Sequence, residues 1–197
     1  MKRAAVLVSG GGTNLQALID ARRMGKMPSV ELALVISDRE GAFALERAKQ
    51  NNIKISVLRR RDFASAEAYD HAFCNVLKEN NIDLAVLAGF LSIIGPATLG
   101  AYRKRIINIH PSLLPAFGGK GFYGVKVHEA ALNRGVKVSG ATVHYVDDEV
   151  DGGEIIAQKA VAVLEGDTPE TLQRRIMEEA EWQILPAAVE LLCKGEL

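Results

Sequence analysis

The chain has 197 residues, of which 48% are hydrophobic and 24% charged, and its 24 Lys+Arg and 24 Asp+Glu leave a formal net charge of zero. A chain of this length fits one domain and buries roughly 70% of its unfolded surface, so it needs neither disulfides nor a structural metal to fold. The charge balance argues against a nucleic-acid surface, and no apolar run approaches the length of a membrane span.

The N-terminal half alternates strand-like and helix-like segments. Short runs rich in Val, Ile and Leu predict strands, and the segments between them repeat apolar residues at the intervals of amphipathic helices. The predicted strands are Ala4–Ser9, Val30–Ser37, Ile55–Leu58 and Asp83–Ala88, and the predicted helices are Asn14–Met24, Phe43–Asn51 and Ala66–Asn80. This alternation predicts a parallel sheet with right-handed crossovers, and the near-continuous apolar strands indicate helices on both faces.

The C-terminal half predicts strands, a glycine-rich loop and two helices. The strands are Ile106–Ile109, Val136–Val146 and Ile155–Val163, the loop is Phe117–Gly124, and the first helix is Val125–Asn133 with Gly135 as its C-terminal cap. Thr168, Pro169 and Glu170 have the residue types that open a helix. We expect Pro186 to kink or split that helix.

The first loop, Ser9–Asn14 (SGGGTN), joins a predicted strand to a predicted helix. Its glycines allow a ligand to approach closely, and a helix N-terminus presents unpaired N–H groups. We expect phosphate binding here, with Thr13 and Asn14 adding donors; the alternative is a tight turn that Thr13 caps. A dinucleotide fits less well, because Leu15 replaces the third glycine of G-x-G-x-x-G, although Asp38 lies where a ribose-binding acid would.

Asn108 and His110 lie two residues apart where a predicted strand ends. Residues with this spacing point to the same face of a strand. An amide donor beside an imidazole can stabilise an oxyanion and move a proton, so the pair is a candidate catalytic centre. A single histidine at a strand end can equally be structural, and that alternative stays open.

The turn Asp147–Gly153 (DDEVDGG) holds four acids in five residues. A solvated acidic turn is the ordinary interpretation. Calcium fits poorly because the terminal Glu of an EF-hand loop is absent, and zinc fits poorly because His71, His110, His128 and His144 lack ligand spacing. We therefore expect no metal. A carboxylate of this turn could instead pair with His110, orient it and raise its pKa.

Three stretches of sequence give the chain a family resemblance. NIHPSLLPAF (108–117), preceded by AGF (88–90) and followed by TVHYVDDEVDGGEII (142–156), resembles the folate-dependent formyltransferases and formyl-folate hydrolases. SGGGTNLQALID (9–20) is similar to the phosphoribosylglycinamide formyltransferase branch of that family. The resemblance extends from Ala4 to about Leu191.

The resemblance implies roles for individual residues. The catalytic residues would be Asn108, His110 and Asp151, with His144 supporting them from behind. The residues that bind glycinamide ribonucleotide would be Gly12, Thr13, Asn14 and Glu181, the last lying near the substrate amine. The folate-binding residues would be Leu91, Ser92, Ile93, Ile94, Asn108 and Asp147, with the acidic turn touching the pteridine.

The resemblance also implies the organisation and the ligands of the protein. Residues 1–197 would form a single Rossmann-like α/β domain, whose mostly parallel sheet has helices on both faces and an antiparallel C-terminal extension. Residues up to about 100 would bind phosphate, and the remainder would carry catalysis and folate binding. The co-substrate would be 10-formyltetrahydrofolate and the acceptor glycinamide ribonucleotide. No metal, nucleic acid or membrane is expected. Because Cys74 and Cys193 share no motif spacing and the N-terminus shows no cleavage site, we expect reduced thiols and a cytoplasmic protein, as a monomer or homodimer.

The implied reaction is direct attack of the glycyl amine on the formyl carbon. Asn108 and His110 would stabilise the tetrahedral oxyanion, while Asp151 would hold His110 charged and position a water that shuttles the proton.

Two features depart from the family pattern. Ser92 replaces a usual cation, and a basic residue is absent around residues 66–69, where one of the arginines 59–61 could supply charge instead.

Three other functions remain as alternatives. A formyltetrahydrofolate hydrolase would use the same three catalytic residues with water as the formyl acceptor. Such hydrolases resemble chains with an extra N-terminal regulatory domain, and a first strand that begins at Ala4 leaves no room for one here. A formyltransferase for initiator tRNA should carry a basic C-terminal domain, whereas this neutral chain stops at Leu197. A non-catalytic phosphosugar-binding domain would have no use for Asn108, His110 and Asp151 together.

Overall fold

The computed structural model describes residues 1–196, and one seven-stranded sheet runs through it in the order β3-β2-β1-β4-β5-β6-β7. The strands are β1 Lys2–Val8, β2 Val30–Ser37, β3 Lys54–Val57, β4 Leu84–Leu87, β5 Ile106–His110, β6 Val138–Tyr145 and β7 Ile155–Ala162. The first five strands pair in parallel, and β6 and β7 are antiparallel. The predicted mostly parallel sheet with an antiparallel C-terminal extension is confirmed.

Helices cover both faces of the sheet. They are α1 Thr13–Arg23, α2 Phe43–Gln50, α3 Ala66–Glu79, α4 Pro96–Ala101, α5 Val125–Arg134, α6 Pro169–Ile176 and α7 Trp182–Lys194. Arg60–Asp62 adds a 3₁₀ turn, and Met177–Glu181 is a π-helical segment between α6 and α7. Among residues 1–196, no helix is long and apolar enough to cross a membrane.

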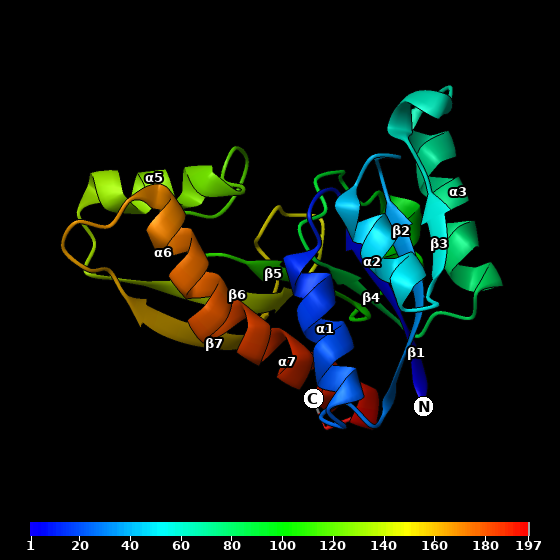
Figure 1. Cartoon of the computed structure of the whole chain (residues 1–197). Helices are drawn as coiled ribbons and strands as arrows, with labels where there is room; N and C mark the ends of the chain where they lie inside the picture. The colour runs from blue at the N-terminus through cyan, green and yellow to red at the C-terminus, as the bar shows by residue number, and fades with distance from the viewer. Residues whose placement is uncertain (197) are drawn as a thin grey trace.

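Two hydrophobic cores form because alternate side chains of each strand point to opposite faces. One core joins Val6 and Val35 of the sheet to residues of α1, α2, α5, α6 and α7. The other joins Leu7 and Ile36 to α3, whose Phe73 is almost fully buried. Figure 1 views the molecule from the first of these faces, with α1, α6 and α7 in front of the sheet.

The ends of several helices agree with the sequence, but two features of the helices do not. Thr168 accepts a hydrogen bond from Thr171 N, and Gly135 caps α5 in the left-handed conformation, both as predicted. Pro186 was expected to kink or split the last helix, and it does not split it, because it lies inside α7 and the interruption is the π segment that precedes it. The short helix α4 was not predicted.

The strand order reverses between β1 and β4, and the carboxyl edge at such a point is the usual ligand crevice of an open α/β sheet. The loops that follow these two strands are tied together there. Ser9 N donates to Gly89 O at 3.1 Å, and Leu91 N donates to the Ser9 hydroxyl at 2.8 Å. The predicted phosphate loop and the segment after Gly89 therefore share one edge of the sheet.

Candidate active site

Asn108, His144 and Asp151 converge at the end of β5. Asn108 is paired with His144 of the antiparallel strand β6, so their side chains lie on one face. Asn108 Nδ2 lies 3.1 Å from His144 Nε2 and 3.4 Å from Asp151 Oδ1. Asp151 reaches this position because the acidic turn after β6 folds back over the sheet, with Asp151 itself at a φ of 58°. The predicted catalytic residues Asn108 and Asp151 are thus in contact, and His144 contacts both.

His110, the last residue of β5, lies directly behind Asp151. Its Nδ1 is 3.5 Å from Asp151 Oδ2, and its Nε2 is 2.8 Å from the carbonyl oxygen of Phe117. A carbonyl only accepts, so Nε2 carries the hydrogen. Burial lowers the pKa of His110 below its usual 6.5, and this effect outweighs the attraction of Asp151. Asp151 raises this pKa as expected, but the expectation that it keeps His110 charged is wrong, because a ring with 4% exposure loses the solvation that a charge needs.

Hydrogen bonds to the backbone fix the other members of the cluster. His144 Nδ1 lies 2.8 Å from the Tyr145 carbonyl oxygen, so Nδ1 is the donor there, and Nε2 accepts from Asn108 Nδ2. Burial would raise the pKa of Asp151, but the contact with His144, the hydrogen bond from Gly119 N and the nearby His110 together hold it below its usual 3.8. Asp151 is therefore an anion at neutral pH.

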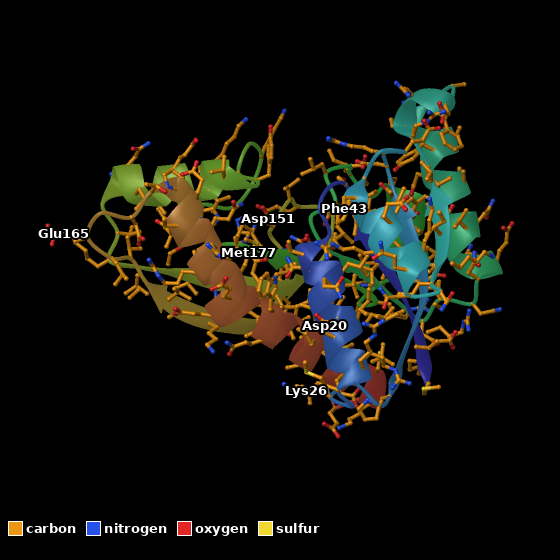
Figure 2. The ribbon with its side chains drawn as sticks, in the orientation of Figure 1. Asp20, Lys26, Phe43, Asp151, Glu165 and Met177 are labelled. Atoms are coloured by element: carbon orange, nitrogen blue, oxygen red, sulfur yellow. The ribbon has the colours of Figure 1, made fainter. Side chains whose placement is uncertain are left out.

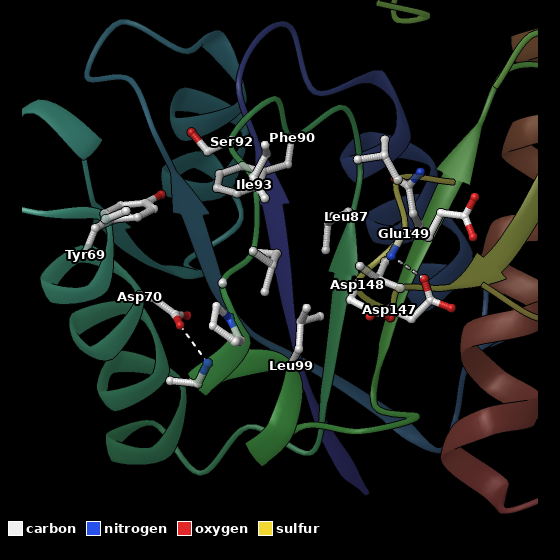
Figure 3. A pocket seen from close by; sticks show the side chains of 18 of the residues that line it. Tyr69, Asp70, Leu87, Phe90, Ser92, Ile93, Leu99, Asp147, Asp148 and Glu149 are labelled. Atoms are coloured by element: carbon white, nitrogen blue, oxygen red, sulfur yellow. Dashed lines mark hydrogen bonds between the residues drawn. The ribbon is translucent and has the colours of Figure 1, made fainter. Parts of the chain in front are cut away.

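A cavity of about 1050 Å³ opens beside this cluster, on the α3 face of the sheet. Asn108, His144 and Asp151 line one side of it, whereas His110 does not line it. The lining also includes all the remaining residues that were predicted to bind folate, namely Leu91, Ser92, Ile93, Ile94 and Asp147. Figure 3 shows Tyr69 and Ser92 across the cavity from Asp147, Asp148 and Glu149.

The phosphate loop begins α1 on the opposite side of the sheet from this cavity. Gly12 is the N-cap of α1 at a φ of 72°, so the alternative in which Thr13 caps the helix is wrong. Ala44 N donates to Gly10 O at 3.0 Å, and Arg47 Nε donates to Gly11 O at 2.8 Å. Because the N–H of a trans peptide points away from its C=O, these bonds to α2 turn the N–H groups of Gly11 and Gly12 outward.

Gly12 also has a packing role that the sequence did not reveal. A side chain at this position would place its Cβ 2.6 Å from Ala44 Cβ, so the close approach of the loop to α2 requires glycine. Gly10 and Gly11 differ, because an added Cβ would meet nothing within 4 Å. The loop therefore leaves space for a ligand beside Gly10 and Gly11.

The π segment places Glu181 beneath the phosphate loop. Asn14 Nδ2 donates to Glu181 Oε2 at 2.6 Å, while Asn14 Oδ1 is buried without a hydrogen-bond partner in the described part of the chain. Burial raises the pKa of Glu181 from 4.5 to about 7, against the opposing bond from Asn14. Nearby, Thr13 Oγ1 lies 3.6 Å from the sulfur of Met177, which Figure 2 labels beside the start of α1.

Several groups of the site escaped the sequence analysis. The Phe117 carbonyl and the Gly119 N–H are backbone groups, whose roles depend on the path of the glycine-rich loop and leave no side-chain signal. Arg47 is four residues into a helix that carried no ligand motif. Within residues 1–196, no cluster of three or more His, Cys, Asp or Glu side chains is arranged to hold a metal ion.

Comparisons with known proteins agree on one kind of enzyme. The formyl transferase family model matches residues 2–189. The chain is 38% identical over 197 residues to the chloroplastic phosphoribosylglycinamide formyltransferase of Arabidopsis thaliana, covering 100% of this chain and 67% of that one. It is 46% identical to a trifunctional purine biosynthetic protein adenosine-3 of Drosophila pseudoobscura pseudoobscura, of whose length it spans 14%.

Solved structures give the same result. A glycinamide ribonucleotide transformylase 1 from Symbiobacterium toebii superimposes with a TM-score of 0.92 at 46% identity, over 99% of this chain and 89% of that one. A phosphoribosylglycinamide formyltransferase from Bacillus halodurans superimposes with a TM-score of 0.91 at 44% identity, over 100% and 97% of the two chains.

Proposed function

The chain belongs to the formyl transferase family, and we propose that it transfers the formyl group of 10-formyltetrahydrofolate to the glycyl amine of 5'-phosphoribosylglycinamide, a step of purine biosynthesis. The observation that carries this proposal is the contact of Asn108, His144 and Asp151 on the wall of the large cavity. An amide donor and a carboxylate at one spot suit an attack that creates an oxyanion and releases a proton.

Asn108 would stabilise the oxyanion. One hydrogen of its Nδ2 is anchored on His144 Nε2, which leaves the other beside Asp151 Oδ1 at the longer distance of 3.4 Å. The oxygen of the attacked formyl group can take over that second hydrogen as its negative charge develops. Since a preorganised donor needs no rearrangement at the moment of reaction, the anchored amide lowers the barrier.

Asp151 and His110 would handle the proton. The amine nitrogen becomes positive as its bond to the formyl carbon forms, and the Asp151 carboxylate can accept a hydrogen bond from it at the cavity wall. Neutral His110 behind Asp151 can hold the released proton as an imidazolium, with its Nδ1–H facing the carboxylate. The proton then moves to the folate nitrogen as the carbon–nitrogen bond to folate breaks.

The ribonucleotide would bind along the carboxyl edge of β1. Its phosphate would meet the outward N–H groups of Gly11 and Gly12 and the first turn of α1, with Thr13 beside it. Asn14 and Glu181 would contact the part of the substrate nearer the amine. In this arrangement residues up to about 100 carry the phosphate loop and one wall of the folate cavity, and the later residues carry the catalytic groups and the opposite wall.

The test is to measure loss of the formyl group from 10-formyltetrahydrofolate with and without glycinamide ribonucleotide. We expect turnover only when the ribonucleotide is present, with the formylated ribonucleotide and tetrahydrofolate formed in equal amounts. Comparable turnover without the acceptor would identify the protein as a formyltetrahydrofolate hydrolase. Binding of both ligands without any turnover would support a phosphosugar-binding domain instead.

A further inference from the structure

Ser9 connects the phosphate loop to the wall of the large cavity. It follows β1 directly and is the first residue of the loop. Its backbone N–H donates to Gly89 O at 3.1 Å, and its hydroxyl accepts from Leu91 N at 2.8 Å. Because Ser9 is only 5% exposed, both bonds are shielded from bulk water. The first residue of one proposed binding site is thus hydrogen-bonded twice to the other.

Residues 88–95, here called the cavity segment, join β4 to α4 without regular secondary structure. Figure 3 shows Phe90, Ser92 and Ile93 of this segment beside the cavity. The side chains with which the segment lines the cavity are Phe90, Leu91, Ser92, Ile93 and Ile94. Because the segment belongs to no strand or helix, its backbone N–H groups need partners in neighbouring elements. The position of this cavity wall therefore depends on a few hydrogen bonds.

The other hydrogen bonds that hold the cavity segment come from different parts of the chain. Ala88 N donates to Leu7 O at 2.9 Å where the segment begins. The Ser92 hydroxyl donates to Asp38, the residue after β2, at 2.9 Å. Asp70 of α3 accepts from the first N–H groups of α4, where the segment ends. Of these anchors and Ser9, Ser9 alone belongs to the phosphate loop.

The phosphate loop is held on its other side by α2. The carbonyl oxygens of Gly10 and Gly11 accept from this helix, and the N–H groups of Gly11 and Gly12 point outward. Glycine has more backbone freedom than any other residue, so the loop next to Ser9 is its least restricted part. A phosphate on the outward N–H groups restricts that freedom, and with it the position of the Ser9 hydroxyl that holds Leu91.

We propose that Ser9 is a positioning residue that couples the two substrate sites. A phosphate bound by the loop fixes the Ser9 hydroxyl, which then holds the cavity segment in place for the folate. The inference rests on the proposed function and extends it, because it concerns how each substrate assists the binding of the other. Since such coupling is reciprocal, bound folate raises the affinity for the ribonucleotide by the same factor.

The experiment measures the Kd of tetrahydrofolate by calorimetric titration, with and without saturating glycinamide ribonucleotide. This pair cannot react, because no formyl group is present. We expect the ribonucleotide to lower this Kd by about fivefold in the unaltered protein, which is the lower end of coupling between sites and fits a single hydrogen bond. Ser9→Ala should bring the ratio of the two Kd values close to one, and Ser9→Thr, which keeps the hydroxyl, should retain the coupling.

Ser92→Ala is the matched control, because it removes the bond to Asp38 from the same segment and leaves Ser9 in place. It should weaken tetrahydrofolate binding equally with and without the ribonucleotide, so the ratio of the two Kd values stays as in the unaltered protein. Three results would overturn the inference: a Kd that the ribonucleotide does not change in the unaltered protein, a ratio that Ser9→Ala leaves intact, or an equal loss of the ratio in Ser92→Ala.

A second measurement follows the cavity segment itself and needs neither formyl transfer nor a stable Ser9 variant. Hydrogen exchange at the Leu91 amide is measured by NMR in inorganic phosphate and in chloride at equal ionic strength. We expect phosphate to slow this exchange by about fivefold in the unaltered protein, since it suppresses the local opening that breaks the bond to Ser9. Exchange that is equally fast in both salts would refute the coupling. If formyl transfer is absent while phosphate still slows exchange at Leu91, the proposed function fails and the role of Ser9 stands.

Discussion

Replacing Glu181 with Gln removes a carboxyl group that titrates inside the protein. The pKa of Glu181 is about 7 in the fold, because burial raises it from the value of 4.5 that the unfolded chain retains. Below pH 4.5 the Glu181 carboxyl group is protonated in both the folded and the unfolded state, and its contribution to the free energy of unfolding is fully present. As pH rises toward about 7 the unfolded chain has released a proton that the fold still holds, so the free energy of unfolding falls.

The difference between 4.5 and about 7 corresponds to about 3 kcal/mol. We expect the free energy of unfolding to fall by about this amount more in the unaltered protein than in Glu181→Gln between pH 4.5 and pH 8. Gln keeps a carbonyl that can accept the bond from Asn14 Nδ2. The measurement is urea unfolding at a series of pH values, followed by circular dichroism and by fluorescence of the single tryptophan, Trp182.

Glu179→Gln is the control, because Glu179 is an exposed acid of the same π segment. Its pH dependence should follow that of the unaltered protein. Parallel curves for the unaltered protein and Glu181→Gln would refute the reasoning, since they would mean that Glu181 titrates alike in the folded and unfolded states.

Three further predictions concern the catalytic residues and the phosphate loop. Asn108→Ala should lower kcat by about 10²–10³-fold with an unchanged circular dichroism spectrum, and a loss below tenfold would contradict its role as oxyanion donor. The double variant of His110→Ala and Asp151→Asn should have a kcat little below that of the slower single variant. Asp151→Asn alone should lower the pKa of His110 further, as measured by NMR titration. Additive losses of kcat together with an unchanged pKa of His110 would show that the two residues do not act together. Gly11→Ala should fold normally and raise the KM for the ribonucleotide without changing the KM for folate. Gly12→Val should lower the melting temperature, because its Cβ would collide with α2. A lower melting temperature for Gly11→Ala than for Gly12→Val would refute the assignment of the packing role to Gly12.

The local elements could be predicted because their sequence signals are local. Val30–Ser37 matches β2 in full, and the predicted helix from Ala66 ends within one residue of the end of α3. Helix α4 has only six residues, too few for a periodic pattern, and its start is fixed by Asp70, which is distant in sequence. Pro186 was assigned the break in the last helix because proline is a visible breaker, whereas a π segment has no comparable signal.

The residues of the site could be predicted from the sequence, but the pKa changes of these residues and the contacts between their side chains could not. The two-residue spacing of Asn108 and His110 gave their shared face, and the family resemblance gave Asp151. The sign of the pKa change at His110 depends on how much solvent its ring loses, and that depends on the Phe117–Gly119 loop folding over it. The contact between Asn108 and His144 depends on the register of two antiparallel strands, which composition alone does not determine.

The π segment Met177–Glu181 has a consequence for changes in chain length. A π turn holds about one residue more than an α turn, and each residue of an α-helix advances the chain by about 100°. In an uninterrupted α-helix the nine steps from Ile176 to Leu185 would put the two residues about 180° apart. The π turn absorbs one of these residues, so the offset falls to about 80°. Both side chains are in fact buried in the same core. Deleting one residue here would convert the π turn into an α turn and leave the offset at about 80°, because eight α steps of about 100° separate the two positions. The π turn therefore absorbs one extra residue and keeps α6 and α7 in phase, so the segment tolerates the loss of one residue but not the gain of another in an α-helical turn.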